Sequence, residues 1–392
     1  MLIKNPEMLQ ELVVDLRSRG SLALDTEFIR EKTYRPVLCL IQIATPDEAF
    51  IVDPFLVGEL DGLLELVLDE SVEKIVHAGE QDMEIFFAMN RQPPRGIFDT
   101  QVAAALAGQG DSISYQRLVD QLLGVQLDKA ETFTDWGKRP LTQRQVEYAL
   151  NDVRYLYPLK NELVKRLEKL ERLEWLSEEL QFYENRSLYE RDPEKLYKKI
   201  KGAVKLAPAK LVVLRELVAW REAEAERMDW PRGRVISDAA LVELARREPA
   251  TVEDVGLVRT IHPQLVNRSG KEIVSRVARA RKVPASEYPP AIRKRAGDTE
   301  LALVVDLLEV VLRTRAANAQ IAPGYLGTRK ELLELARQHL RRGGDGESGP
   351  ERRALPLLSG WRKRIVGDAL VALLEGRSRV AIDAATARVE EV

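Results

Sequence analysis

The sequence predicts an α/β domain with a mixed sheet, followed by all-α helical domains. Short apolar strands bounded by turn residues begin within the first 60 residues, and strands then alternate with helices up to about residue 110. After residue 200 the strand pattern almost disappears, and amphipathic helical patterns take its place. Strands that give way to alternating strands and helices are typical of an α/β domain. A chain of 392 residues is also long enough for two or three domains.

The α/β domain is expected to start with a helix and three strands joined by short connections, which favours an antiparallel start to the sheet. Two shorter strands and a series of helices should follow. The strands are predicted over residues 21–28, 38–44, 49–53, 74–77 and 97–98, and the helices over 6–19, 62–68, 80–89, 100–107, 114–123 and 142–170.

A linker and two helical modules are predicted beyond the α/β domain. A long charged helix is expected from about 160 to 190, with a linker around Arg191. The segment LVELAR at 241–246 returns as LLELAR at 332–337, which suggests two similar helical modules. A polar loop over Arg341–Arg353 is expected within the second module.

These patterns divide the chain into four predicted parts. They are an α/β domain over residues 1–170, a helical linker over 171–202, a first helical module over 203–285 and a second, diverged helical module over 286–392.

Composition excludes several classes of protein. The single cysteine, Cys39, rules out internal disulfides and Cys-rich zinc sites, and three histidines leave little scope for histidine metal chemistry. No signal peptide and no apolar run of 18 residues is present, so we expect a cytoplasmic protein with no membrane contact. We also expect a monomer.

The net charge of −2 hides an asymmetry. Residues 1–200 carry 25 Lys and Arg against 36 Asp and Glu, whereas residues 201–300 carry 20 against 14. A basic second half suggests a polyanionic partner, although chance partition of solvated faces is the alternative.

The predicted strand LALDTEF carries two carboxylates, Asp25 and Glu27. Because strand side chains alternate between faces, these two point the same way and repel each other. A hard divalent cation such as Mg²⁺ or Mn²⁺ between them would remove that cost. The alternative is a pair of ordinary acids at a solvated strand end.

Two further acids could join this pair. Asp82 lies in the first turns of the predicted helix 80–89, where the helix dipole also favours an acid for structural reasons. Asp152 lies four residues after Tyr148, so that the phenol and the carboxylate share one helix face. Taken singly, each residue also has a purely structural explanation.

Together these residues resemble the ribonuclease D family of DEDD-type 3′→5′ exonucleases, in the subtype with a tyrosine in the last motif. The resemblance covers essentially the whole chain. It is carried by LALDTEFIREKTYRPVLCLIQIA, KIVHAGEQDMEIFF, FDTQVAAAL, SYQRLVDQLLGVQLDK, TDWGKRPLT and YALNDVRYLYPL. The second half resembles the HRDC helical module, most clearly over Leu211–Pro249, and the second module resembles a diverged copy.

The resemblance implies a ribonuclease H-like exonuclease domain followed by HRDC-like domains. It also implies a nuclease that binds two divalent metal ions, Mg²⁺ or Mn²⁺, and releases 5′-nucleoside monophosphates from RNA 3′ ends. In this picture Asp25, Glu27, Asp82 and Asp152 hold the metals, and Tyr148 orients the attacking water. The implied role is tRNA processing, with tRNA precursors and other small structured RNAs as partners.

Five further residues are candidate substrate contacts, each with a structural alternative. His77 either contacts substrate or is a hydrogen-bonded core histidine, and Phe28 and Trp136 either stack on terminal bases or pack in the core. Lys138 and Arg139 either steer phosphates or are simply solvated. A basic surface is also expected on the first helical module, formed by Lys201, Lys205, Lys210, Arg232, Arg234, Arg246 and Arg247.

Two rival functions remain open on the residues alone. Proofreading DNA exonucleases share this motif set, so a DNA-directed 3′→5′ exonuclease is the first rival. The second is a non-catalytic RNA-binding protein, which the five intact catalytic positions argue against.

Overall fold

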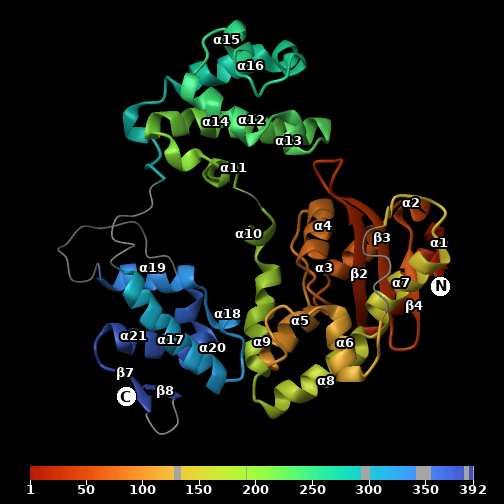
Figure 1. Cartoon of the computed structure of the whole chain (residues 1–392). Helices are drawn as coiled ribbons and strands as arrows, with labels where there is room; N and C mark the ends of the chain where they lie inside the picture. Colours follow the sequence, from red (N-terminus) through yellow and green to blue (C-terminus); the bar gives the residue numbers. More distant parts are fainter. Residues whose placement is uncertain (128–133, 191, 293–300, 341–354, 384–387, 392) are drawn as a thin grey trace.

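A six-stranded mixed sheet forms the centre of the α/β domain in the computed structural model, which describes residues 1–127, 134–190, 192–292, 301–340, 355–383 and 388–391 (Figure 1). The strand order is β1-β4-β3-β2-β5-β6. The strands are β1 (Leu2–Ile3), β2 (Ser21–Ile29), β3 (Val37–Ala44), β4 (Ala49–Val52), β5 (Glu73–Val76) and β6 (Ile97–Asp99). The five predicted strands are present, and β1 is an additional two-residue edge strand.

The predicted antiparallel start of the sheet is confirmed. β2 pairs antiparallel with β3, and β3 with β4. β5 then joins β2 in parallel, and β6 joins β5 in parallel. β2 is therefore flanked by β3 on one side and β5 on the other, which places the LALDTEF strand in the interior of the sheet.

Helices cover both faces of this sheet. α1 (Pro6–Arg19), α3 (Asp61–Leu68) and α4 (Glu80–Asn90) pack on the face that carries Leu22 and Leu24. α7 (Gln143–Arg154) crosses the other face over β2, β3 and β4. Beside it, α5 (Thr100–Leu106), α6 (Tyr115–Leu123) and α8 (Leu156–Lys169) pack against Ala23 and Ile75. α2 (Pro54–Val57) is a single turn after β4.

The prediction of continuous helices over 142–170 and 160–190 was wrong, because each of these segments is broken into shorter helices. The first ends at Arg154, and α8 begins at Leu156. Pro158 explains this break, because proline is tolerated in the first turn of a helix but disrupts a helix interior. Glu171 has a positive φ of 57° and ends the next segment. The linker then consists of α9 (Leu173–Leu180), the 3₁₀ turn η1 (Gln181–Glu184) and α10 (Arg186–Tyr189).

The first helical module has a hydrophobic core of its own, built on Leu214, Leu217, Leu241 and Ile273. Its helices are α12 (Pro208–Met228), α13 (Arg232–Val235), α14 (Asp238–Arg247), α15 (Val252–Gly256) and α16 (Pro263–Ala280), and α11 (Pro193–Leu196) leads into it.

The second helical module shares one core with the α/β domain. Leu308 and Trp361 belong to the same buried cluster as Leu106 and Leu159. Its helices are α17 (Ala302–Asn318), α18 (Pro323–Leu326), α19 (Arg329–Leu340), α20 (Gly360–Arg362) and α21 (Asp368–Leu374). The predicted loop at Arg341–Arg353 lies outside the described residues.

The second module is not wholly helical, because a small hairpin follows its helices. β7 (Val380–Asp383) and β8 (Arg388–Glu391) pair antiparallel. In both modules a long helix, a one-turn helix and a helix of 10 or 12 residues follow in the same order. The internal repeat and the four boundaries at 170, 202, 285 and 392 stay predictions.

Membrane insertion was considered from helix length and hydropathy. Within the described residues, every helix is either too short or too polar to span a bilayer.

Candidate active site

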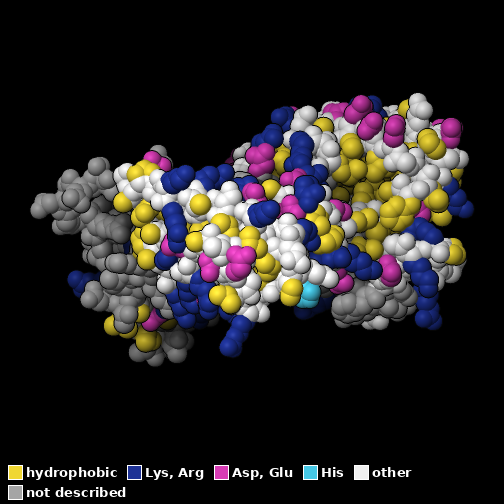
Figure 2. Space-filling model, turned by 90° about the horizontal axis from the view of Figure 1, so that it is seen from above, with side chains coloured by type: hydrophobic (Ala, Val, Ile, Leu, Met, Phe, Trp, Pro, Cys, Tyr) yellow, Lys and Arg dark blue, Asp and Glu magenta, His cyan; other side chains and the backbone are white. Residues whose placement is uncertain are grey.

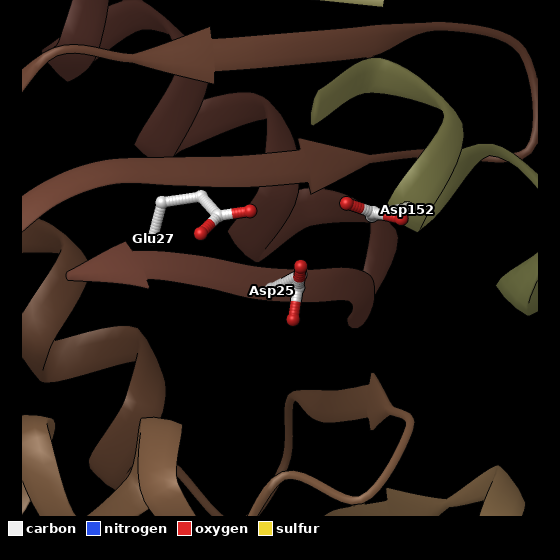
Figure 3. A group of neighbouring side chains, drawn as sticks. All are labelled: Asp25, Glu27 and Asp152. Atoms are coloured by element: carbon white, nitrogen blue, oxygen red, sulfur yellow. The ribbon is translucent and has the colours of Figure 1, made fainter. Parts of the chain in front are cut away.

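Three carboxylates from two separate elements converge at one point of the α/β domain. Asp25 and Glu27 come from β2, and Asp152 comes from the C-terminal end of α7 (Figure 3). One oxygen atom of each lies within 4.8 Å of the corresponding atoms of the other two. All three side chains are partly buried. An acid near a helix C-terminus is disfavoured by the helix dipole, so Asp152 is not there to stabilise α7.

The alternation of β2 accounts for the orientation of the first two acids. Asp25 lies opposite Gln42 of β3, and Glu27 lies opposite Leu40, on the face that α7 covers. Thr26 between them points to the other face, where it is buried. The register of β2 and β3 shifts just after Glu27, at Phe28. The prediction that both carboxylates share one face is therefore confirmed.

Asp82 projects toward the site from α4, and a hydrogen bond from Thr26 fixes its carboxylate. It lies in the first turn of α4 and is almost fully buried. The Thr26 hydroxyl donates a hydrogen bond to its carboxylate. Asp82 lies outside the cluster of three carboxylates, yet its charge raises the pKa of both Asp25 and Glu27. Asp82 therefore influences the charge of the site from a greater distance than the other three carboxylates.

Hydrogen bonds and close packing fix the turn between β5 and α4, and this turn sets the position of Asp82. Asp99 accepts hydrogen bonds from the backbone N–H groups of Ala78 and Gly79, at 3.0 and 3.1 Å. A Cβ on Gly79 would lie 2.7 Å from the Val76 side chain, so a larger residue there would force Val76 to shift. The Tyr183 hydroxyl donates to the same Asp99 carboxylate at 2.5 Å, which ties the linker to this turn.

Burial raises the pKa of every acid in the site, and repulsion by the other acids of the site adds to the rise for Asp25 and Glu27. Burial raises the pKa of Asp25 well above its ordinary value, and the charges of Asp82, Asp152 and Glu27 add to it. Burial, with Asp152 and Asp82, raises the pKa of Glu27 to about 8. Burial also raises the pKa of Asp152 to about 7 and that of Asp82 to about 6. Ionised together these groups repel, and a bound cation would relieve that repulsion.

Tyr148 lies one turn before Asp152 on α7, as predicted from their spacing. Its ring is partly exposed and tilts against that of Trp136, with the ring centroids 6.0 Å apart. Trp136 is only 5% exposed and packs with Leu40 and Ile51. This burial favours the packing alternative for Trp136.

His77 has the contacts of a core histidine. Its Nε2 donates to the Ile113 carbonyl at 3.0 Å, and its Nδ1 lies 2.9 Å from the Thr100 hydroxyl. The ring also meets Tyr115 edge-on. Burial lowers the pKa of His77, so the neutral ring is favoured. Both ring nitrogens are engaged inside the protein, which favours the structural alternative.

Arg139 is anchored internally, which argues against both alternatives predicted for it, a phosphate contact and a solvated side chain. Its guanidinium makes two hydrogen bonds to the buried Asp53 carboxylate, at 2.6 and 3.0 Å, and donates to the carbonyls of Trp136, Lys138 and Cys39. A guanidinium with all its nitrogens engaged has no donor left for a phosphate. Lys138 is exposed, and the Phe28 ring is partly exposed with Arg30 stacked over it, so both stay candidate contacts.

Tyr115 is a residue that the sequence reasoning missed. Its hydroxyl donates to the Asn151 carbonyl at 2.8 Å and accepts from the Tyr155 N–H at 3.2 Å. These two groups flank Asp152 at the break between α7 and α8. Tyr115 therefore holds the backbone around Asp152 in place. Its position 37 residues upstream offered no signal for this contact.

Comparison with known proteins identifies the family. A family model described as 3'-5' exonuclease matches residues 1–168, and one described as HRDC domain matches residues 210–277. Ribonuclease D of Gluconacetobacter diazotrophicus is 37% identical over 98% of this chain and 95% of its own length. That of Sphingobium indicum is 36% identical over 97% and 96%. The chain belongs to the ribonuclease D family of exoribonucleases.

Solved structures agree with this assignment. Escherichia coli RNase D, described as an exoribonuclease involved in structured RNA processing, superimposes with a TM-score of 0.84 and 28% identity over 96% of this chain and 98% of its own. The catalytic core of RRP6 from Trypanosoma brucei shares the fold, with a TM-score of 0.56 and 24% identity over 71% of this chain and 79% of its own. An exonuclease domain followed by a helical region that contains an HRDC domain, as in ribonuclease D, therefore accounts for nearly the whole chain.

Proposed function

We propose that the protein is a metal-dependent 3′→5′ exoribonuclease that releases 5′-nucleoside monophosphates and matures the 3′ ends of tRNA precursors and other small structured RNAs. The observation that carries this proposal is the convergence of Asp25, Glu27 and Asp152 within 4.8 Å. Membership of the ribonuclease D family supports the reaction, and the printed description of the E. coli enzyme supports structured RNA as the substrate class.

The donor set of the site fits hard divalent cations. It consists of carboxylate oxygens, which Mg²⁺ and Mn²⁺ prefer, with no sulfur or imidazole in the cluster. Asp25, Glu27 and Asp152 would bind directly, and Asp82 would act from its position on α4. Two such ions would supply an activated water and neutralise charge on the phosphate and the leaving 3′-oxygen.

The remaining chemistry falls to the protein's own side chains. Tyr148 projects from the same face of α7 as Asp152 and would orient the attacking water. A phenol has an ordinary pKa near 10, so Tyr148 is suited to holding a water rather than deprotonating it at neutral pH. Lys138 and Phe28 are accessible and would contact the terminal nucleotides.

The first helical module offers a smaller basic surface than its composition predicted. Lys210 pairs with Glu248, Arg247 and Arg246 with Glu243, and Arg232 with Glu222. Figure 2, which views the molecule from the side of this module, shows basic side chains dispersed among acidic ones. Lys201, Lys205 and Arg234 are exposed and have no ion pair among the described residues, so these three would contact phosphates.

The test uses a tRNA precursor with a short 3′ extension, supplied with Mg²⁺ or Mn²⁺. The wild type is expected to shorten it from the 3′ end to nucleoside 5′-monophosphates, and EDTA should stop the reaction. Asp25→Asn should lose activity at least about 100-fold, because removing one charge weakens the cation site. Unchanged shortening by Asp25→Asn, or none by the wild type, would refute the proposal.

A DNA substrate is the competing reading of the same site, because the family model that matches residues 1–168 is described only as 3'-5' exonuclease. Matched RNA and DNA oligonucleotides in one reaction would separate the two. Preferential loss of the DNA strand would favour the DNA exonuclease. Cytoplasmic location and a monomeric state stay predictions.

A further inference from the structure

Gln42 is a buried polar residue beside the carboxylate cluster. It lies in β3 directly opposite Asp25 of β2, and opposite Ile51 of β4. Residues directly opposite in an antiparallel pair share a face, with Cβ atoms about 4.5–5.5 Å apart. Gln42 therefore lies on the face with Asp25, beneath α7, and its side chain is 0% exposed.

The amide of Gln42 has no hydrogen-bond partner among the described residues. Both Oε1 and Nε2 are buried and unpaired. Buried amides are nearly always paired, because an unpaired one loses its bonds to water without replacement. Gln145, a second buried glutamine on this face, follows the rule: it bonds to Thr142 at 2.9 Å and to Thr134 at 3.1 Å.

The surroundings of Gln42 would suit an apolar residue better. Leu40 and Ile51 flank it, and the buried cluster around them continues to Ala149 of α7. Across the strand, the polar neighbours are Asp25 directly opposite and Glu27 on the diagonal. Packing alone would therefore favour an apolar side chain at this position. The polar group next to the amide is the Asp25 carboxylate on the neighbouring strand.

We propose that Gln42 is a positioning residue for Asp25. Its side-chain N–H donates to the Asp25 carboxylate when that carboxylate holds a divalent cation, and so fixes the orientation of the carboxylate. Metal-binding carboxylates commonly depend on such a second hydrogen bond, and loss of the partner lowers metal affinity or activity 10–100-fold. The inference rests on the proposed metal site.

The test compares wild type with Gln42→Met, which keeps the length of the side chain and removes the amide. Calorimetry with Mn²⁺ alone should give 10–100-fold weaker binding in the variant. The melting temperature of the metal-free protein should be unchanged or higher, because no bonded group is lost. With RNA, kcat should fall and KM should stay the same. Ile51→Leu, which alters packing on the other flank of Gln42, is the control and should bind Mn²⁺ as wild type does.

The outcomes separate this inference from the proposed function. If wild type binds no Mn²⁺, the metal site itself fails and the inference falls with it. If wild type binds Mn²⁺ and Gln42→Met binds it equally well, only the inference is overturned. Gln42→Leu is the second apolar variant. A lower melting temperature in both variants would also overturn the inference, since it would reveal a structural partner for the amide.

Discussion

The first helical module contacts the α/β domain through the loop over residues 30–36 and through Arg91 at the end of α4, whereas the second module shares a hydrophobic core with that domain. In Figure 1 the first module lies above the domain and the second lies beside the linker helix α9. The first has its own core, to which the α/β domain contributes only Tyr34 among the described residues. The two modules resemble each other in the order of their helices, so the difference lies in what they are attached to.

Apart from the packing of Tyr34, the contacts of the first module with the α/β domain are polar. The loop over residues 30–36, which follows β2, donates the Tyr34 N–H to Asp229 at 3.0 Å. Arg232 stacks over the Tyr34 ring at 4.8 Å and pairs with Glu222 at 2.5 Å. Arg35 pairs with Glu226 beside them. Contacts of this kind contribute little free energy each and are screened by salt.

The contact of the second module is buried and continuous. The rings of Trp175 in the linker and Trp361 are stacked 4.9 Å apart, and the Trp361 indole donates to Glu179 at 2.7 Å. Arg172 is buried and donates to the carbonyls of Leu106 in the α/β domain and of Ala319, which directly follows α17, at 2.7 and 2.5 Å. The α/β domain, linker and second module therefore form one folding unit, and the first module is a separate one.

Truncation should reveal the largest difference between the two modules. A chain ending at residue 285 loses the second module and exposes the core around Leu106 and Leu159, so its α/β domain should fail to melt cooperatively and only the transition of the first module should remain. Residues 193–292 alone should fold and melt cooperatively. Circular dichroism of both fragments checks this. A 1–285 fragment whose α/β domain melts cooperatively would contradict the shared-core interpretation.

Single substitutions should separate the two contacts next. Trp361→Ala should destabilise the protein by about 3–5 kcal/mol, because it opens a cavity at a stacked, buried indole. Tyr34→Ala, the matched aromatic substitution at the other contact, should cost about 1 kcal/mol. Hydrogen exchange should rise in α5, α8 and α17 for the first variant, and only in the loop over residues 30–36 for the second. Equal effects would show that the contacts are equivalent.

Ionic strength should have the smallest effect and act on one contact only. Arg35 and Glu226 are each about half exposed, so salt should screen their pairing. We would raise NaCl from about 0.05 to about 1 M to weaken it. Small-angle scattering should then give a larger radius of gyration, because the first module moves away from the α/β domain. Cleavage sites in the second module should stay protected from protease. A radius of gyration that does not change with salt would show that packing, rather than charge, holds the loop.

Residue patterns were a good guide where the cause is local. The alternation of β2 placed Asp25 and Glu27 on one face, and the helical spacing placed Tyr148 and Asp152 on one face of α7. Pro158 marked the start of α8, although the periodic pattern around it suggested one continuous helix. The internal anchoring of Arg139 was not predicted, because its basic, polar surroundings in the sequence do not reveal Asp53, which is 86 residues away.

The sequence by itself determined the family, the five strands from β2 to β6 with the antiparallel start of the sheet, and the set of candidate acids, because these depend on short motifs and on the period of strands and helices. Only the tertiary structure decided that Tyr115 holds the backbone at Asp152, that Gln42 lies unpaired beside Asp25, and that the two helical modules are attached so differently. The reason is physical: hydrogen bonds and shared cores between distant segments depend on how the elements pack, and sequence spacing carries no record of that packing.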